Sequence, residues 1–234
     1  MPDRVVPTLL QTHDSSEIAA LLSRIYSAIT RIASALCGNQ KRGAAVVRIV
    51  MTRGMRQLQQ WTDPSQAEAY FLHHTVLLCR RDARLPDLRD DVLLTRTSMR
   101  DRADYIAFIQ AIRTLLPQQR EAFILNVAQG LNIRWTGVAM DCSATAASTH
   151  LDVALRALRA LAGPSYDALV QILIDVYRTL GPDESLSLPL VRKAWRNQRK
   201  WRMVKHAFAI VVCLVMISVA GMVIYWLTKV VEFG

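Results

Sequence analysis

Four polar side chains near the start of an expected helix have the types and spacing needed to hydrogen-bond a nucleic acid. The segment 140–158, MDCSATAASTHLDVALRAL, joins a polar turn to small and apolar residues at helical spacing. The polar residues outside its apolar stripe are Thr145, Ser148, Thr149, His150, Arg156 and Arg159. Hydroxyl and imidazole groups hydrogen-bond to bases and phosphates, and arginine neutralises phosphate. Because no lysine or arginine occurs from Ala144 to Leu155, we expect weak electrostatic attraction to DNA.

The same pattern has a second interpretation, a helical hairpin that serves only as core. Under both interpretations the segment forms a helix-turn-helix scaffold. Gly137 and Ala147 are small enough for the two helices to cross closely, and Ser143 suits the cap of the second helix. The two interpretations differ only in whether the exposed face of the second helix binds anything.

A second group of residues able to contact nucleic acid lies in an expected helix over 63–81. Asp63, Pro64 and Gln66 form a helix-start pattern with a capping box. The residues concerned are Tyr70, Phe71, His73, His74, Arg80 and Arg81. Aromatic rings stack on unpaired bases, and arginines bind backbone phosphates. Alternatively the aromatic residues belong to the core, and one of the two histidines faces inward.

The chain shows helical spacing nearly throughout and predicts an all-α fold. Gly38 ends a first helix expected from Ser16, and a second is expected over about 43–61. The organisation we expect is two small helical domains at 16–81 and 104–160 joined by a charged linker at 82–103, then an extra amphipathic helix at 164–181, and a linker with a polybasic segment at 182–206.

Neither enzyme nor metal chemistry is predicted. The sequence contains no P-loop, GxGxxG, HExxH or GxSxG motif, and no Cys/His set with ligand spacing, so we expect no cofactor and no metal. The adjacent pair His73–His74 lacks the i, i+4 spacing or third ligand that a metal would need. The four cysteines are far apart among apolar neighbours and are expected to be small buried hydrophobic residues.

The end of the chain predicts a single transmembrane helix. Residues 207–227, AFAIVVCLVMISVAGMVIYWL, contain no charge and would span about 32 Å as a helix at ~1.5 Å per residue. The basic residues just before it are Arg192, Lys193, Arg196, Arg199, Lys200, Arg202 and Lys205. They supply seven of the net +10 charge, leaving +3 (10 − 7) for the first 191 residues, since Lys229 and Glu232 cancel. This asymmetry predicts a single-pass inner-membrane protein with cytoplasmic N-terminal domains, and a basic cluster that contacts anionic lipid.

Two stretches of the chain resemble the sigma-70 family of bacterial transcription initiation factors, in its extracytoplasmic-function branch. LLPQQREAFILNVAQGLNIRWTGVAMDCSATAASTHLDVALRAL is similar to region 4, and LLSRIYSAITRIASALCGN with LQQWTDPSQAEAYFLHHTVLLCRR is similar to region 2. The residues of the region 4 pattern are Leu116, Pro117, Arg120, Glu121, Phe123, Gly130, Leu131 and the run 139–143. The resemblance covers about residues 16–160.

The resemblance implies promoter DNA and the RNA polymerase core as partners. In the family, region 4 places its second helix in the major groove, while region 2 docks on the polymerase and opens the promoter. The resemblance therefore implies contacts with duplex DNA for Thr145, Ser148, Thr149, His150, Arg156 and Arg159. It implies contacts with the opened promoter for Tyr70, Phe71, His73, His74, Arg80 and Arg81. The family's docking helix usually has acidic residues, whereas here it contains Lys41, Arg42, Arg48 and Arg53 and no acid. The family also usually has a basic residue where this chain has Ser148 and His150.

Three functions are therefore open at the level of sequence. The first is a membrane-anchored sigma factor released by a signal, an anti-sigma partner or a protease. The second is a sigma-like scaffold that acts at the membrane as an anti-sigma-type adaptor without initiating transcription. The third is a tail-anchored helix-turn-helix regulator that binds DNA without polymerase.

Overall fold

The computed structural model describes residues 14–58, 60–81, 87–98 and 102–182, together with residues 216 and 218. Within these residues every regular element is a helix and no strand occurs, which confirms the all-α prediction. The chain divides into two compact units, Met1–Pro189 and Leu190–Gly234. In the second unit the description is limited to Met216 and Ser218, both helical.

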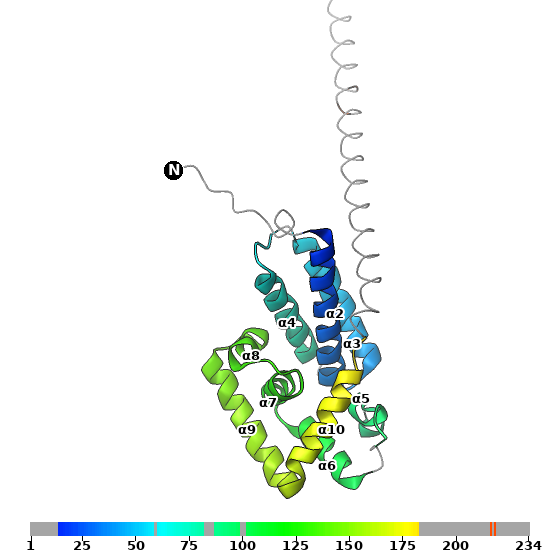
Figure 1. The fold of residues 1–234 in the computed structure, drawn as a ribbon, viewed down its shortest axis with the longest axis vertical. Helices are drawn as coiled ribbons and strands as arrows, with labels where there is room; N and C mark the ends of the chain where they lie inside the picture. Colours follow the sequence, from blue (N-terminus) through cyan, green and yellow to red (C-terminus); the bar gives the residue numbers. More distant parts are fainter. Residues whose placement is uncertain are drawn as a thin grey trace, which may run out of the picture. The chain divides into compact units, whose positions relative to one another are not determined.

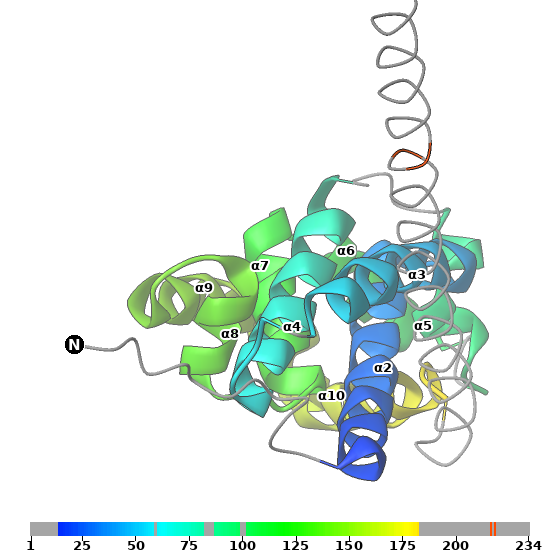
Figure 2. The same ribbon diagram turned by 90° about the horizontal axis from the view of Figure 1, so that it is seen from above.

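Three helices form the N-terminal half of the first unit: α2 (Ser15–Cys37), α3 (Gln40–Gln57) and α4 (Pro64–Arg81). They lie side by side in Figures 1 and 2 and contact one another pairwise. The apolar stripe of α2 is buried, with Leu22, Ile29 and Ile32 fully inaccessible. Burial of each such side chain stabilises the fold by about 1.5–3 kcal/mol. The predicted first helix is therefore present, and Gly38 ends it in the left-handed conformation at φ 63°.

Polar side chains set the starts of α3 and α4. The side chain of Asn39 accepts hydrogen bonds from the backbone N–H groups of Lys41 and Arg42, so α3 begins three residues before the predicted start at 43. At α4, Asp63 accepts from the N–H of Ser65 at 2.7 Å, and the Gln66 side chain accepts from the N–H of Thr62 at 3.1 Å. The predicted capping pattern at 63–66 is present, with Gln66 reaching back one residue further than expected.

Part of the segment that we expected to be a charged linker is packed into the core. Within it, η1 (Leu88–Asp90) and α5 (Val92–Thr95) are helical, and Val92, Leu93 and Leu94 are buried. The carboxylate of Asp91 is also buried and accepts two hydrogen bonds from the Arg113 guanidinium, at 2.6 and 3.0 Å. The many charges over 82–103 led us to predict a solvated linker. They include Asp91, whose charge is buried in an ion pair with Arg113, and they flank three apolar residues that are buried.

The C-terminal half of the first unit begins with α6 (Ala103–Thr114). It continues with α7 (Pro117–Phe123), the π-helical turn η2 (Ile124–Ala128), α8 (Ile133–Met140), α9 (Ala144–Ala162), η3 (Gly163–Ser165) and α10 (Tyr166–Thr179). Both halves belong to the same compact unit, and α4 contacts α8.

The extra amphipathic helix expected at 164–181 corresponds to η3 and α10. α10 contacts η2, α9 and α2, and its Tyr177 hydroxyl donates to the Gln129 side chain at 2.7 Å. Just after α10, the Ser27 hydroxyl of α2 donates to the Pro182 carbonyl at 2.8 Å. The sequence left open whether this helix covers the helix-turn-helix or recruits a partner. In the structure its apolar face is buried within the unit, as expected of a covering helix.

The membrane-span prediction at 207–227 and the basic cluster at 192–205 lie outside the described residues, apart from Met216 and Ser218. Among the helices that the structure describes, none has both the length and the apolarity needed to cross a membrane. Of the cysteines, Cys37 and Cys79 have their sulfur atoms 3.6 Å apart. Cys37 and Cys79 are buried as predicted, whereas Cys142 is half-buried.

Candidate nucleic-acid interface

The helix that leads into the helix-turn-helix is closed by a π-turn. The backbone N–H of Gln129 bonds to the carbonyl of Ile124 at 2.9 Å, and the N–H of Leu131 bonds to the carbonyl of Leu125 at 3.0 Å. Gly130 has φ 78°, a conformation that favours glycine. This turn changes the chain direction between Ala128 and α8, and the Asn126 side chain supports it by donating to the Leu131 carbonyl at 2.8 Å.

The turn between α8 and α9 has the compact geometry of a helix-turn-helix. Asp141 adopts the left-handed conformation at φ 61°, and the N–H of Cys142 bonds to the Gly137 carbonyl at 3.0 Å. A Cβ atom at Gly137 would lie 2.8 Å from the Cys142 carbonyl oxygen. Ser143 then caps α9 by accepting from the N–H of Ala146 at 3.1 Å. The predicted roles of Gly137 and Ser143 are confirmed.

One face of α9 packs on α7 and α8, and the opposite face is open. Ala147, Ala154 and Leu158 are fully buried, and Leu151 is buried at the rim. Thr145 and Thr149 are exposed, while Ser148 and His150 are half-buried. The structure therefore brings the four predicted polar residues onto the first two turns of α9, where a helix in the major groove contacts base edges.

The two arginines of α9 are both exposed but have different surroundings. Arg156 donates to the Asp152 carbonyl one turn earlier, at 3.4 Å. The Arg159 guanidinium lies 5.2 Å from the centre of the Tyr166 ring, a cation–π contact that directs it toward the start of α10. Arg156 is therefore the better placed of the two for a phosphate near the polar face of α9.

The helix-turn-helix is attached to α4 by an ion pair that the sequence did not predict. Arg80 donates to both oxygens of Glu121, at 2.9 and 2.6 Å, and to the carbonyl of Met140 at 3.1 Å. Hydrogen bonding to Glu121 raises the pKa of Arg80, against an opposing contribution from burial. The Arg80 guanidinium is occupied by Glu121 and Met140, although its side chain is 30% exposed, so a phosphate would compete with these partners. Arg81 is exposed.

The aromatic residues of α4 form a cluster with Trp61. The Tyr70 ring lies 4.0 Å from the His74 ring and 5.2 Å from Trp61, and the rings of His73 and His74 are 5.0 Å apart. Phe71 is fully buried against Gly54, so this member of the predicted group belongs to the core and is not placed to stack on a base. Tyr70, His73 and His74 are half-buried and stay at the surface.

The surroundings of His74 change its titration. Burial lowers the pKa of His74, with further contributions from His73 and Arg53. Its Nδ1 atom is buried without a hydrogen-bond partner among the described residues. The sequence prediction that one of the adjacent histidines faces inward therefore applies to His74.

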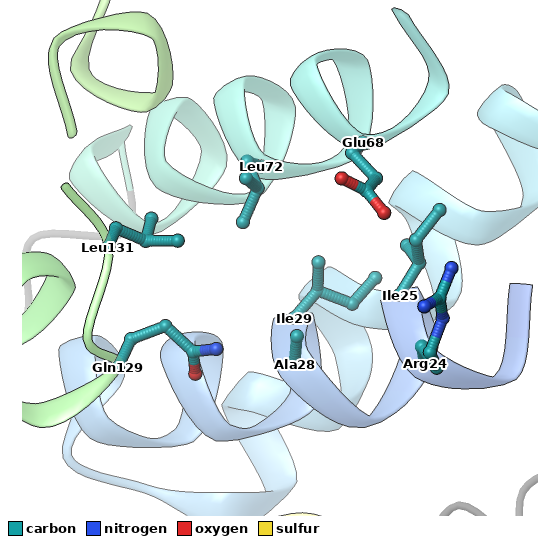
Figure 3. Close-up of a pocket in the computed structure, with 8 residues that line it drawn as sticks. All are labelled: Arg24, Ile25, Ala28, Ile29, Glu68, Leu72, Gln129 and Leu131. Atoms are coloured by element: carbon teal, nitrogen blue, oxygen red, sulfur yellow. The ribbon is translucent and has the colours of Figure 1, made fainter. Parts of the chain in front are cut away.

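A cavity of about 210 Å³ lies between α2 and α4, close to the π-turn (Figure 3). Ile25, Ile29 and Leu72 form its apolar walls, and Arg24 and Glu68 stand at one end. None of the residues that we predicted to contact DNA lines it. The cavity marks the junction between the two halves of the unit.

Sequence reasoning missed one exposed residue of the helix-turn-helix. Arg134, in the first turn of α8, is exposed. The first helix of such a motif crosses the DNA backbone, and a basic residue there suits a phosphate. Asn132 caps α8 by accepting a hydrogen bond from the N–H of Trp135 at 2.9 Å. A capping asparagine can be recognised in the sequence, and it would have placed Arg134 in the first turn of the helix.

Comparison with known proteins gave no identification. No protein family matches the chain, and no curated protein and no solved structure is similar to it.

Proposed function

We propose that this chain is a membrane-anchored, sigma-factor-like protein that binds promoter DNA through α8 and α9 and directs the RNA polymerase core in regulated initiation. The observation that supports this function best is the open polar face of α9. Thr145 and Thr149 are exposed on the first turns of a helix whose opposite face is fully packed. The first eight residues of α9 contain no aspartate or glutamate, so no acidic side chain on these turns repels phosphate.

The apolar segment 207–227 is the membrane anchor in this proposal. Anchoring would regulate access of the chain to its promoter. A protein held at the inner membrane meets only DNA that approaches the bilayer. An anti-sigma partner or a protease that cuts the tether would release the helical unit into the cytoplasm. In the membrane, the intact chain therefore has low activity on its own promoter until it is released. In detergent this restriction does not apply.

A direct test measures DNA binding by the full chain in detergent. We expect a sequence-specific footprint in which His150→Ala and Arg156→Ala weaken binding, and in which Arg156→Ala lowers the slope of log affinity against log salt by about 0.9. Arg178→Ala, an exposed arginine of α10, is the matched control. Binding that is equal in all three variants would show that α9 does not contact DNA.

A second function is favoured by two specific observations. α3 has no acidic residue for the docking expected of the family, and α9 has no basic residue before Arg156. Both features suit a sigma-like adaptor that binds a transcription partner at the membrane without starting transcription. Binding of polymerase without initiation would favour this alternative.

A further inference from the structure

The exposed face of α3 is a basic surface that the proposed function leaves unused. Its exposed basic side chains are Lys41, Arg48, Arg53 and Arg56, which we call the α3 basic face. The helix contains no aspartate or glutamate. Lys41 and Arg56 are 15 positions apart, which corresponds to about 22 Å along a helix at ~1.5 Å per residue.

Three of these side chains, Lys41, Arg48 and Arg53, keep their charge available for a ligand. Within the described residues, Lys41, Arg48 and Arg53 take part in no ion pair. The nearby Asp91 is buried and its carboxylate is bound by Arg113. At the N-terminal end of α3, Arg96 donates to the Gln40 side chain and adds another guanidinium to the surface.

The other side of α3 fixes the helix firmly to the unit. Val46, Val47 and Val50 are buried, and a Cβ atom at Gly54 would lie 2.4 Å from the Phe71 ring. The basic side chains therefore project from a rigid, buried support. At the C-terminal end, Arg53 acts electrostatically on Tyr70 and His74, which places it beside the aromatic cluster of α4.

We infer that the α3 basic face binds the phosphate backbone of a single nucleic-acid strand, independently of base sequence. Arginines in a row bind successive phosphates, and the half-buried rings of Tyr70 and His74 lie at the end of that row, where a base can stack. A helix that lies in an anionic bilayer surface combines its basic side chains with an exposed apolar face. The large apolar side chain exposed on α3 is Ile49, at 39%. The composition of the face therefore favours nucleic acid over lipid.

This surface is separate from the α9 interface, so the inference goes beyond the proposed function and can fail without it. Figures 1 and 2 both show α4 between α3 and α9. In the family that the sequence resembles, the corresponding helix docks on polymerase through acidic residues. Here the basic side chains of this helix suit phosphate, and the inference does not depend on where polymerase docks.

The test compares two full-length variants that lose the same charge. In one, Lys41, Arg48 and Arg53 become glutamine; in the control, Arg24, Arg89 and Arg178 do, all of them exposed. Both are made in a chain whose seven basic residues at 192–205 are glutamine, so that this segment does not bind the probe. The probe is a fluorescein-labelled 25-nucleotide oligodeoxythymidine, titrated in detergent at several salt concentrations.

Loss of three phosphate contacts should lower the slope of log affinity against log salt by about 2, and the affinity at 0.1 M salt by about 100-fold. The control should retain both values. A charge-conserving variant, Arg48→Lys with Arg53→Lys, should keep the salt slope, which separates loss of contact from loss of folding. Equal slopes in the glutamine variant and its control would overturn the inference.

If the α3 basic face binds anionic lipid instead, the same assay gives a different result. Phosphatidylglycerol in mixed micelles would then displace the probe from the control protein at a lower phosphate concentration than unlabelled oligonucleotide does. That result would overturn the inference in favour of an anionic lipid surface. Displacement that requires more lipid phosphate than nucleotide phosphate supports the nucleic-acid assignment.

Discussion

Arg80 near the end of α4 and Glu121 in α7 are bound through two hydrogen bonds, although 41 positions separate them in the chain. The same guanidinium bonds to the carbonyl of Met140, the last residue of α8. A single side chain therefore connects α4 to both helices that support α9. The orientation of the α9 polar face is set relative to α4, and not only within the helix-turn-helix.

Removing this connection should weaken the unit. We expect Arg80→Ala to lower the free energy of unfolding by about 2 kcal/mol, because it leaves the buried Glu121 carboxylate without its charge-assisted hydrogen bonds. Arg81→Ala, at the exposed neighbouring position, should change it by less than about 0.5 kcal/mol. Chemical denaturation of both variants measures the difference, and equal midpoints would contradict the role of the ion pair.

Loss of the buried ion pair Asp91–Arg113 should lower the free energy of unfolding more than loss of Arg80 does. Asp91→Ala leaves a buried guanidinium without its carboxylate, so we expect a loss of about 3–5 kcal/mol, enough to unfold a marginal domain. The exposed neighbour supplies the control, since Asp90→Ala removes the same charge without a buried partner. If circular dichroism shows both variants melting at the wild-type temperature, α5 is not anchored as described.

His74 should make stability depend on pH below neutrality. Burial lowers the pKa of His74 in the folded protein, so the unfolded chain binds a proton at a higher pH than the folded one does. The contribution of His74 is fully present above its unfolded pKa of about 6.5 and decreases as pH falls toward its folded pKa. We expect His74→Gln to lose less stability than wild type between pH 7.5 and 5.5. An equal or larger loss in the variant would contradict this assignment.

The close approach at Gly137 should be intolerant of a methyl group. Alanine favours helix by about 1 kcal/mol over glycine. The Cβ atom, however, would lie 2.8 Å from the Cys142 carbonyl oxygen, and backbone displacement of this kind costs about 1–3 kcal/mol. We expect Gly137→Ala to be net destabilising and to weaken DNA binding by displacing α9. Val138→Ala, at an exposed position of the same helix, should affect neither property. A more stable Gly137→Ala protein would show that the turn has room.

The parts of the fold predicted from sequence are those determined by local patterns. The stripe of α2, the cap at Asp63 and the turn at Gly137 and Ser143 depend on residues within a few positions of one another. Each can be recognised from spacing, because helix periodicity and capping act over one or two turns.

The features that sequence reasoning missed depend on distant partners. Asp91 and Arg113 lie 22 positions apart, and the charges around Asp91 predicted a solvated linker. Arg80 was assigned to phosphate because no local pattern identifies Glu121 as its partner. Phe71 was assigned to base stacking because its burial depends on the absence of a side chain at Gly54 of another helix. In all three cases, the surroundings of the side chain are set by contacts with residues distant in the sequence.

The central claim is that the α8–α9 motif belongs to a factor that starts transcription. The most direct measurement is run-off transcription with the full chain in detergent, core RNA polymerase and genomic fragments from the source organism. The proposal predicts start-site-specific transcripts that depend on the chain and that decrease in the Thr149→Ala, Arg156→Ala double variant. Transcripts no different from those of core polymerase alone, obtained with a folded chain, would contradict it.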